Sequence, residues 1–501
     1  MSITERYQGQ ILGVLSFFDR VIISGSLPDI CHARAATLWL HQHQIKIFDF
    51  PRFAQQLRDA IRDNAERLAQ EAGLTIEYLK NARTVRKEKR IQEVLAERGT
   101  APGLVHVFSV LENCPSYQPW HDKSKQTTFL RPDSGKCLHY YFYFIDAELG
   151  LCYLRVPTYA PFRLQFYFNG HSWLAAALER AGIGFRLLDN AFLSIDDFAR
   201  AQHIADRFSV PRLHRRLEQL AYRYCPVVRE FLNGVHWSLM QVEYATDIAF
   251  RQRADLQPLY AMLVRTAVHA VKADQVATFL GRPLDPRYQG ELGSDFSTRI
   301  QGTRIKHTMG RAALKMYDKF GRVLRLETVA NDVSFFKVRR EVEHRDGSSQ
   351  MKTAPVRKTI YSLPVLSKLL HAANQRYLEF LSTLDDSSSG TRRLDRITRT
   401  VRKGKRNYRG FNVLQDDDRA LFETLARGEF NIHGFTNRDL RQHLSTCAAG
   451  LGRKLKRLRM HGLIKKIGST YKYYLTPLGR QAVTAALMIR ALVLLAAMAN
   501  L

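Results

Sequence analysis

Two stretches in which apolar and polar residues alternate limit the fold of this chain more than any other feature. "RAALKMYDK" and "RVLRLETV" lie on either side of "KFGR", between Arg311 and Val329. Side chains on a β-strand point to alternate faces, so this pattern predicts a β-hairpin with Gly321 in its turn. One face would carry Leu314, Met316, Leu324 and Leu326, and the other Lys315, Tyr317, Val323, Arg325 and Glu327.

A further strand with the same alternation is expected earlier in the chain. In "VEYATDIAF", from Val242 to Phe250, the apolar positions share one face and leave Glu243 and Asp247 together on the other. A sheet that contains both stretches could present Asp247, Glu327, Tyr317 and several cations on one surface.

Positive side chains greatly outnumber negative ones. The chain has 76 Lys and Arg against 47 Asp and Glu, a formal net charge of +29. Folding does not require this imbalance, which points to a polyanionic partner, with nucleic acid as the first candidate. The start of the chain resembles no signal peptide, so we expect a cytoplasmic, nucleoid-associated protein. The apolar tail from Ala482 to Leu501 contains Arg490, which favours a packing or homodimerisation helix over a membrane partner.

The N-terminal half mixes helical and strand patterns. "SFFDRVIISGSLP" suggests a buried strand, and apolar residues at helical spacing from Phe53 to Glu97 predict two or three amphipathic helices. The aromatic stretch from Cys137 to Thr158 predicts a β-hairpin, followed by a strand at "FRLQFYF" and a helix at "SWLAAALERAGI". His171, in the turn-like sequence before that helix, is a candidate site residue.

The C-terminal part reads as three helices and a short hairpin. The helices are expected from Arg419 to Arg427, from Thr436 to Leu444 and from Ala448 to His461, followed by the strands "LIKKI" and "YKYYLT". This order resembles the winged-helix superfamily, which implies that the third helix enters the DNA major groove. The expected nucleic-acid contacts are Arg453, Lys454, Lys456, Arg457, Arg459 and Lys472, with Arg402, Lys403, Lys405 and Arg406 in the basic linker before them.

Together these patterns predict an α+β protein with a helical N-terminal region, a central mixed sheet with helices, and a C-terminal winged helix. The expected divisions are a mainly helical region 1–100, an α/β region 101–240, a candidate catalytic α/β region 241–383, a basic linker 384–412, a winged helix 413–485 and an apolar helix 486–501.

The shared polar surface has a known chemical use. A tyrosine hydroxyl can attack a DNA phosphate when a divalent metal held by carboxylates withdraws charge and nearby cations hold the strand. Asp and Glu oxygens suit Mg²⁺ or Mn²⁺. His307, on the "TRIKHT" strand, could be a third ligand or a surface histidine in a DNA channel, and Arg304 and Lys306 flank it as further nucleic-acid contacts.

The central segment also resembles a known family. An apolar strand ending in Asp247, then "GTRIKH", "LKMYDK" and "LRLE", is similar to the replication initiators of rolling-circle plasmids and filamentous phages. The resemblance implies a nicking and joining endonuclease of a mobile genetic element that handles single-stranded and duplex DNA. It also implies roles for single residues: Tyr317 as nucleophile, Asp247 and Glu327 as metal ligands, and Lys315, Lys319 and Arg325 as phosphate contacts.

Other interpretations stay open at this stage. The hairpin could be purely structural, and the chain could be a transcriptional regulator without catalysis; that is favoured if Glu243, Asp247 and Glu327 lie far apart. Aromatic strands flanked by arginine also serve RNA stacking, so an effector that works with RNA is a further alternative.

Overall fold

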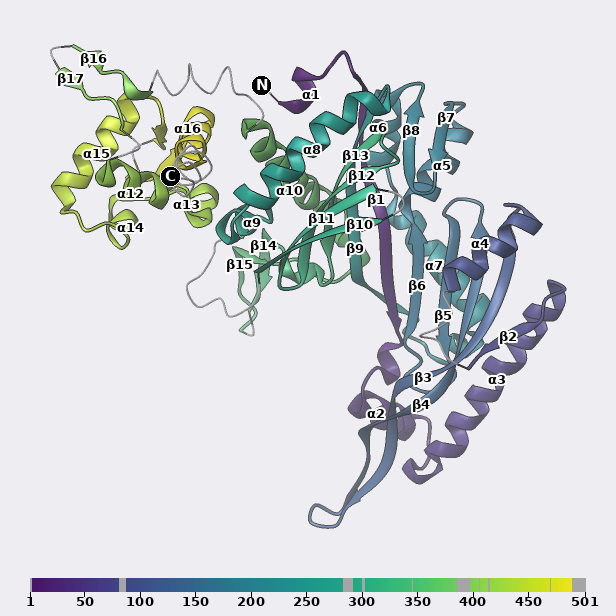
Figure 1. Ribbon diagram of the computed structural model, residues 1–501. Coiled ribbons are helices and arrows are strands. Elements are labelled where there is room, and N and C mark those ends of the chain that lie inside the picture. The colour runs from purple at the N-terminus through teal and green to yellow at the C-terminus, as the bar shows by residue number, and fades with distance from the viewer. Residues whose placement is uncertain are drawn as a thin grey trace.

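The computed structural model is built around one large, strongly twisted sheet (Figure 1). It describes residues 2–80, 87–282, 292–299, 302–344, 346–384, 397–404, 406–412, 415–468 and 470–488. The sheet has 11 strands. In order across it they are β10 (Leu292–Arg299), β11 (Gly302–Met309), β12 (Ala312–Lys319), β13 (Val323–Ala330), β9 (His236–Phe250), β1 (Ile11–Ser26), β6 (Leu164–Asn169), β5 (Gly150–Pro157), β4 (Thr127–Asp146), β3 (Gly103–Asp122) and β2 (Ile76–Leu79).

The chain follows the same path in the two halves of this sheet. Each half begins with a long strand, β1 or β9, and passes through helices to four consecutive antiparallel strands, the last of which pairs with the first. β1 and β9 pair antiparallel at the seam between the halves. The edge strand β2, parallel to β3, is the one addition to this path in the sheet as described. The seam therefore brings together residues that lie more than 200 positions apart, such as Val21 and Val242.

Helices cover both faces of the sheet near the seam. On one face, α8 (Arg253–Ala270) and α10 (Leu363–Leu384) form a core with the apolar side chains of β9, β12 and β13. On the other face, α5 (Gly170–Arg180), α6 (Phe198–Asp206) and the hairpin of β7 (Phe185–Leu188) and β8 (Ala191–Ile195) pack on β1. Before the C-terminal module, the described residues also form the α-helices α1 (Ile3–Arg6), α2 (Ala33–Gln42), α3 (Phe50–Glu71), α4 (Lys87–Arg98), α7 (Val210–Tyr224) and α9 (Ala273–Phe279).

The alternation in the sequence predicted the faces of the seam strands correctly. Leu314, Met316, Leu324 and Leu326 are buried under α8 and α10, so the hairpin of β12 and β13 forms as expected. Gly321 lies in its turn with φ +68°. The strand "VEYATDIAF" is the end of β9, and the α+β class is confirmed. The aromatic hairpin is also confirmed, as β4 and β5.

The N-terminal region is less purely helical than expected. "SFFDRVIISGSLP" does contain a buried strand, but that strand, β1, lies at the centre of the whole sheet. The residues after α3 include Ile76 to Leu79, which were expected to continue a helix and instead form β2. β2 was mistaken for part of a helix because apolar spacing over a few residues does not distinguish a short strand from a helical turn. The central place of β1 depends on long-range pairing, which a local pattern does not show.

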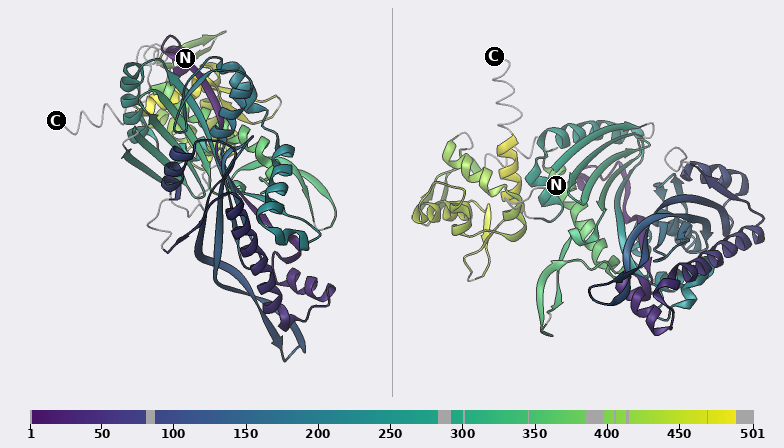
Figure 2. Two further views of the ribbon diagram at one scale, coloured as in Figure 1. Left: turned by 90° about the vertical axis from the view of Figure 1, so that its right-hand side faces the viewer. Right: turned by 90° about the horizontal axis from the view of Figure 1, so that it is seen from below.

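Two hairpins extend away from the body of the protein (Figure 2). β3 and β4 continue as a ribbon well past the rest of the sheet and end in a turn at 123–126. A second ribbon, β14 (Lys337–Glu343) and β15 (Ser349–Pro355), projects as a separate pair of strands. None of the helices in the described part of the chain is long and apolar enough to cross a bilayer.

The C-terminal module has its own hydrophobic core. Its elements are β16 (Val401–Lys403), β17 (Arg406–Tyr408), α12 (Asp416–Leu425), α13 (Gly428–His433), α14 (Asn437–Arg441), α15 (Ala448–Met460), β18 (Ile464–Lys466), β19 (Tyr473–Leu475) and α16 (Pro477–Met488). Phe435 forms an isolated antiparallel β-bridge with Tyr473 of β19, next to the hairpin of β18 and β19. The three expected helices, α12, α14 and α15, and the hairpin of β18 and β19 follow in the expected order, with the short helix α13 between the first two. The winged-helix assignment itself stays a prediction. Most of the expected tail helix 486–501 lies outside the described residues.

The turn of the β12–β13 hairpin gives a test of the fold. Gly321 and Gly73 both have a left-handed φ, +68° and +66°. A Cβ at Gly321 would lie 2.7 Å from Cγ of Arg253, whereas a Cβ at Gly73 meets nothing within 4 Å. We expect Gly73→Ala to cost about 1 kcal/mol from the backbone alone, and Gly321→Ala about 2 kcal/mol. Chemical denaturation measures both; equal costs would contradict the contact with Arg253.

Candidate functional site

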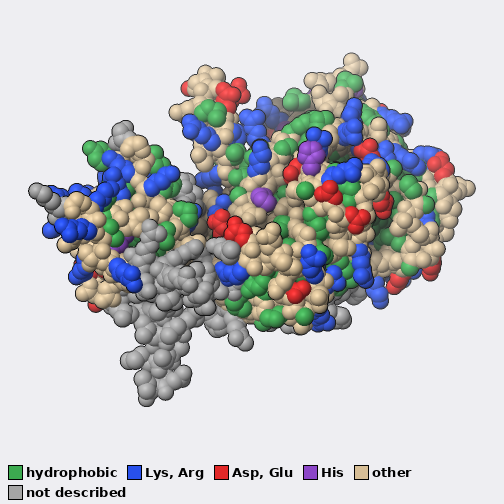
Figure 3. Space-filling view, turned by 90° about the horizontal axis from the view of Figure 1, so that it is seen from above, with side chains coloured by type: hydrophobic (Ala, Val, Ile, Leu, Met, Phe, Trp, Pro, Cys, Tyr) green, Lys and Arg blue, Asp and Glu red, His purple; other side chains and the backbone are tan. Residues whose placement is uncertain are grey.

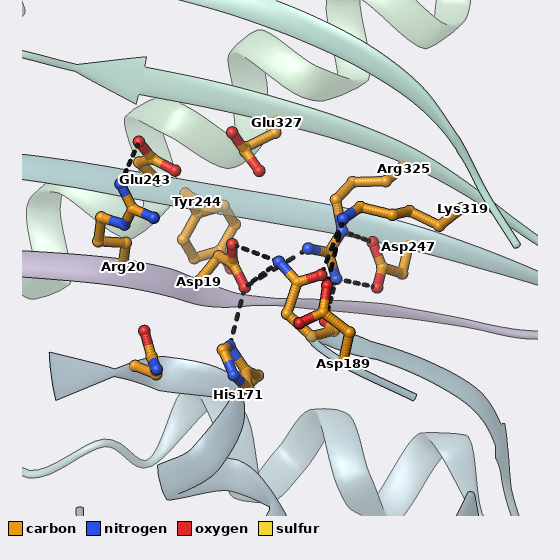
Figure 4. Close-up of polar contacts among 12 residues, drawn as sticks. Asp19, Arg20, His171, Asp189, Glu243, Tyr244, Asp247, Lys319, Arg325 and Glu327 are labelled. Atoms are coloured by element: carbon orange, nitrogen blue, oxygen red, sulfur yellow. Dashed lines mark hydrogen bonds and ion pairs between the residues drawn. The ribbon is translucent and has the colours of Figure 1, made fainter. Parts of the chain in front are cut away.

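Three buried carboxylates meet at the seam of the sheet. Asp19 on β1, Glu243 on β9 and Glu327 on β13 each offer an oxygen, and these oxygens lie within 4.8 Å of one another. Figure 4 shows them on three neighbouring strands, on the face that α5 and the β7–β8 hairpin cover. Like charges at this spacing repel strongly when buried, so the cluster requires cations to balance it.

A β-bulge brings Asp19 and Arg20 together at this cluster. On β1, Phe18 pairs with Tyr244 and Arg20 pairs with Glu243, so Asp19 is an extra residue with no partner of its own on β9. Asp19 continues the alternation of Leu15 and Phe17, which face α5 and α6. A bulge interrupts the alternation of a strand, so Arg20 reaches Glu243 on this same face.

A lysine lies between two of the carboxylates. Lys315 Nζ is 2.5 Å from Glu327 Oε1 and 3.7 Å from Glu243 Oε2, and Arg20 Nη1 is 3.9 Å from Glu243 Oε1. Burial would lower the pKa of Lys315, but Glu327 and Glu243 outweigh it and raise that pKa. Burial and the nearby Glu327 raise the pKa of Glu243 to about 7. Glu243 is therefore poised to exchange a proton near neutral pH.

Arg325 anchors the other end of the site. Its Nε and Nη2 donate to the two oxygens of Asp247 at 2.6 and 2.7 Å, and Nη2 also donates to the carbonyl of Asn190 at 2.5 Å. Its Nη1 is 3.4 Å from Asp19 Oδ1. Asn190 Nδ2 donates to Asp19 Oδ2 at 3.0 Å, and His171 Nδ1 is 3.1 Å from Asp19 Oδ1. Burial opposes the ionised carboxylate, but Arg325 and His171 hold the pKa of Asp19 below its ordinary value.

Tyr317 lies beside the cluster on β12. Tyr317 lies opposite Arg325 of β13, two residues along from the pair of Lys315 and Glu327. The ammonium groups of Lys315 and Lys319 are 5.9 and 5.4 Å from the centre of its ring. Burial, followed by the charge of Glu327, raises the pKa of Tyr317 to about 12. The Tyr317 residue as a whole is half-buried.

The structure distributes the expected site residues differently from the sequence prediction. Glu327 and Tyr317 do lie at the cluster, but Asp247 is held in a bidentate pair by Arg325. Arg325 is fully buried, so it is not placed to contact a phosphate. His307 pairs with Leu314 on the opposite face and bonds to Tyr377 Oη at 2.9 Å, and burial lowers its pKa to about 4.

The remaining cations of the central region lie around the tyrosine. Arg304 pairs across the strands with Tyr317, and Lys306 pairs with Lys315; both are half-buried. Lys319 Nζ donates to Asn190 Oδ1 at 2.9 Å. Burial, followed by the charge of Arg325, lowers the pKa of Lys319. Arg304 and Lys306 thus lie on the β11 side of the site, whereas Lys319 is linked to Asp19 through Asn190.

In the C-terminal module, two of the expected contacts face inward. Arg457 donates to both oxygens of Asp418 at 2.8 Å and lies over the ring of Phe411, so it holds the module together. Lys454 is 3.3 Å from Asp417. Lys405 lies outside the described residues. The other expected contacts are exposed: Arg402, Lys403, Arg406, Arg453, Lys456, Arg459 and Lys472. Lys and Arg side chains crowd the module at the left of Figure 3.

The sequence prediction missed two members of the site. Asp19 stands in "SFFDRVIIS", and an aspartate inside an otherwise apolar strand is the signal that could have identified it. Asn190 lies in the turn between β7 and β8, and no feature of the sequence around it pointed to a functional site. His171, a candidate from its turn-like sequence, does reach the site as the second residue of α5.

Comparison with known proteins adds no name to this geometry. No family model, no curated protein and no solved structure matches the chain.

The pair of Arg325 and Asp247 yields a stability prediction. Arg325→Met leaves Asp247 buried without its cation, and removing one partner of a buried pair costs about 3–5 kcal/mol. The double variant Arg325→Met with Asp247→Leu removes both charges and should recover much of that loss. Arg339→Met, at an exposed arginine of β14, is the matched control and should be nearly neutral. Unfolding midpoints measure this; a double variant no better than Arg325→Met alone would contradict the pairing.

The raised pKa of Glu243 yields a pH prediction. Its pKa rises from 4.5 in the unfolded chain to about 7 in the folded protein, so between these values the folded state binds more protons. Stability should therefore fall as pH rises from about 4.5 to about 7, by roughly 3 kcal/mol in total from this group. Glu243→Gln should remove that part of the slope and raise the melting temperature at pH 8. Thermal unfolding of both proteins from pH 5 to 8 tests it; parallel curves would contradict the shift.

Proposed function

We propose that this chain is a metal-dependent DNA nicking and joining protein with Tyr317 as its nucleophile. The observation that carries the proposal is the meeting of Asp19, Glu243 and Glu327 within 4.8 Å, beside Tyr317 and Lys315 on the adjoining strand. A nucleophile, a cation and a set of carboxylates on one surface are the parts that cleavage of a phosphodiester by tyrosine requires.

The carboxylate cluster is the candidate metal centre. Three hard oxygen donors suit Mg²⁺ or Mn²⁺, and Asp19, Glu243 and Glu327 would hold the ion. When bound, such an ion supplies positive charge to the phosphoryl oxygens that become more negative in the transition state. Lys315 lies against Glu327 and Glu243 and would move from these carboxylates towards the phosphate as the ion binds.

Residues of this chain would carry out the proton and bond changes. The Tyr317 oxygen would form a bond to phosphorus while the bond from phosphorus to one ribose oxygen breaks, which leaves a phosphotyrosine and a free hydroxyl end. The phenol would give its proton to water, a loss that the charges of Glu327 and Glu243 oppose and that of Lys315 favours. The leaving ribose oxygen would take a proton from water, so that no net proton is consumed. Reversal of the same steps rejoins the strand, because the phosphotyrosine bond keeps the energy of the linkage.

The C-terminal module would supply affinity for duplex DNA. Arg453, Lys456 and Arg459 are exposed along α15, which is the helix that a winged helix places in the major groove. The basic hairpin of β16 and β17 adds further exposed cations. Together with the net charge of +29, these groups predict binding that weakens steeply with salt. A replication initiator or a transposase-like strand-transfer enzyme of a mobile element is the role that fits, acting at the nucleoid.

A second function is favoured by one specific observation. The site is already electrically balanced, because Lys315, Arg325, Arg20 and Lys319 offset Asp19, Glu243, Asp247 and Glu327. A balanced ion-pair network can serve purely to hold a sheet together. In that case the chain would bind nucleic acid without cutting it, as a transcriptional regulator.

A cleavage assay separates the two functions and tests the nucleophile. Supercoiled plasmid and labelled single strands of varied sequence are incubated with Mn²⁺ or Mg²⁺ and resolved on a denaturing gel. We expect nicked DNA attached covalently to the wild-type protein, and no such product from Tyr317→Phe.

The matched control is Tyr167→Phe, on β6 at the other side of the cluster. Arg20, which also contacts Glu243, lies 5.7 Å from the centre of the Tyr167 ring. This variant should keep the covalent product. Loss of the product from Tyr167→Phe instead would move the nucleophile to Tyr167. Tight DNA binding without any product from the wild-type protein would favour the regulator.

A further inference from the structure

A cavity with arginines at its mouth lies away from the carboxylate cluster. It has a volume of about 340 Å³ and opens between α5, the segment from α6 to α7, and the turn of β4 and β5. Four of its lining residues are arginines: Arg180 on α5, Arg207 after α6, and Arg212 and Arg216 on α7. Its single acidic lining residue in the described chain is Glu148. A volume of this size fits a small organic ligand.

Two of these arginines have no internal role. Arg216 Nε donates to Asp146 at 2.5 Å, and Arg180 Nε donates to the carbonyl of Ala176 at 3.1 Å. By contrast, Arg207 and Arg212 are exposed, and their guanidinium groups make no hydrogen bond or ion pair with any described residue. Guanidinium groups bind phosphate oxygens in pairs of parallel hydrogen bonds, so two free ones at one cavity are suited to an anion.

The start of α7 strengthens the preference for an anion. α7 is 15 residues long, begins at Val210 and has no acidic residue in its first turn. Ser209 caps it, and both Ser209 and Arg212 line the cavity. Helix N-termini carry partial positive charge and attract anions, and proteins often place a carboxylate there; here arginine takes that position instead.

The inner wall of the cavity is apolar and aromatic. Leu149, Leu213 and Ala177 line it together with Trp173 and Phe208, whose rings meet edge to face at 4.8 Å. The Trp173 side chain is half-buried, so part of its ring faces the cavity. Aromatic rings in such a position stack with nucleobases at about 1–3 kcal/mol per base.

We propose that this cavity binds one nucleotide, with its phosphate on Arg207 and Arg212 and its base against Trp173. Cations at the rim and an aromatic wall inside match the two ends of such a ligand. The same chemistry could come from a free nucleoside triphosphate or from one nucleotide of a single strand. The inference does not depend on the proposed nicking activity, since none of these residues belongs to the carboxylate cluster.

Fluorescence titration of the full chain tests the proposal. The probes are dATP, a ten-residue thymidine oligonucleotide, adenosine and inorganic phosphate. The chain has 4 Trp residues, so Trp173→Phe identifies the part of the quenching that comes from the cavity. We expect dATP or the oligonucleotide to bind and quench the fluorescence of Trp173. Adenosine and phosphate should bind at least about tenfold more weakly, because each offers one half of the ligand.

Charge variants complete the test. Arg207→Gln with Arg212→Gln should weaken binding at least about tenfold. The matched control, Arg200→Gln with Arg215→Gln, removes two exposed arginines of α6 and α7 that do not line the cavity and should leave binding unchanged. Binding of dATP assigns a free nucleotide, and binding of the oligonucleotide alone assigns a nucleotide of a strand. Equal losses in both double variants, or phosphate as effective as dATP, would overturn the proposal. Tyr317→Phe should keep this binding, which separates it from the test of nicking.

Discussion

A guanidinium buried in the middle of the sheet determines how the site is arranged. Arg325 has no exposed surface, and groups on other segments balance its charge: Asp247 on β9, Asp19 on β1 and the carbonyl of Asn190 after β7. Taking an ion out of water costs several kcal/mol, so these segments cannot separate without leaving an unpaired charge behind. The two halves of the sheet and the β7–β8 turn are therefore held in register by electrostatics as well as by packing.

This constraint explains why the carboxylates divide into two groups. Arg325 donates one hydrogen bond to each oxygen of Asp247, so this carboxylate is already paired with a cation. Glu243 and Glu327 lie further along the same two strands, β9 and β13. They contact the more mobile ammonium group of Lys315 instead. Lysine binds as a point charge on a flexible stem, whereas arginine is fixed by its planar fork. Lys315, which lies beside Tyr317, is thus the cation of the site that another cation could displace.

The sequence predicted the pattern within strands much better than the register between them. Alternation placed Glu243, Asp247 and Glu327 on one face correctly, because that follows from the period of a strand. It could not tell which carboxylate pairs with Arg325, since that choice depends on which residues lie opposite one another. His307 was misplaced for a different reason: it lies two residues from Ile305, so alternation within β11 itself places it on the apolar face, where it contacts Tyr377. Asp19 was missed because its place in the site depends on the pairing of β1 with β9, more than 200 positions along the chain.

The distribution of charge separates affinity from chemistry. The buried site is close to neutral, so the net charge of +29 belongs to the rest of the molecule, including the exposed cations of the C-terminal module. A polyanion is therefore attracted to the surface as a whole, and the attraction does not depend on the state of Glu243 or Lys315. At the seam the charged groups are buried instead: burial and Glu327 raise the pKa of Glu243 to about 7, and Lys315 lies between Glu243 and Glu327. Salt should act mainly on binding, and pH mainly on the site, because screening weakens exposed charges far more than buried ones.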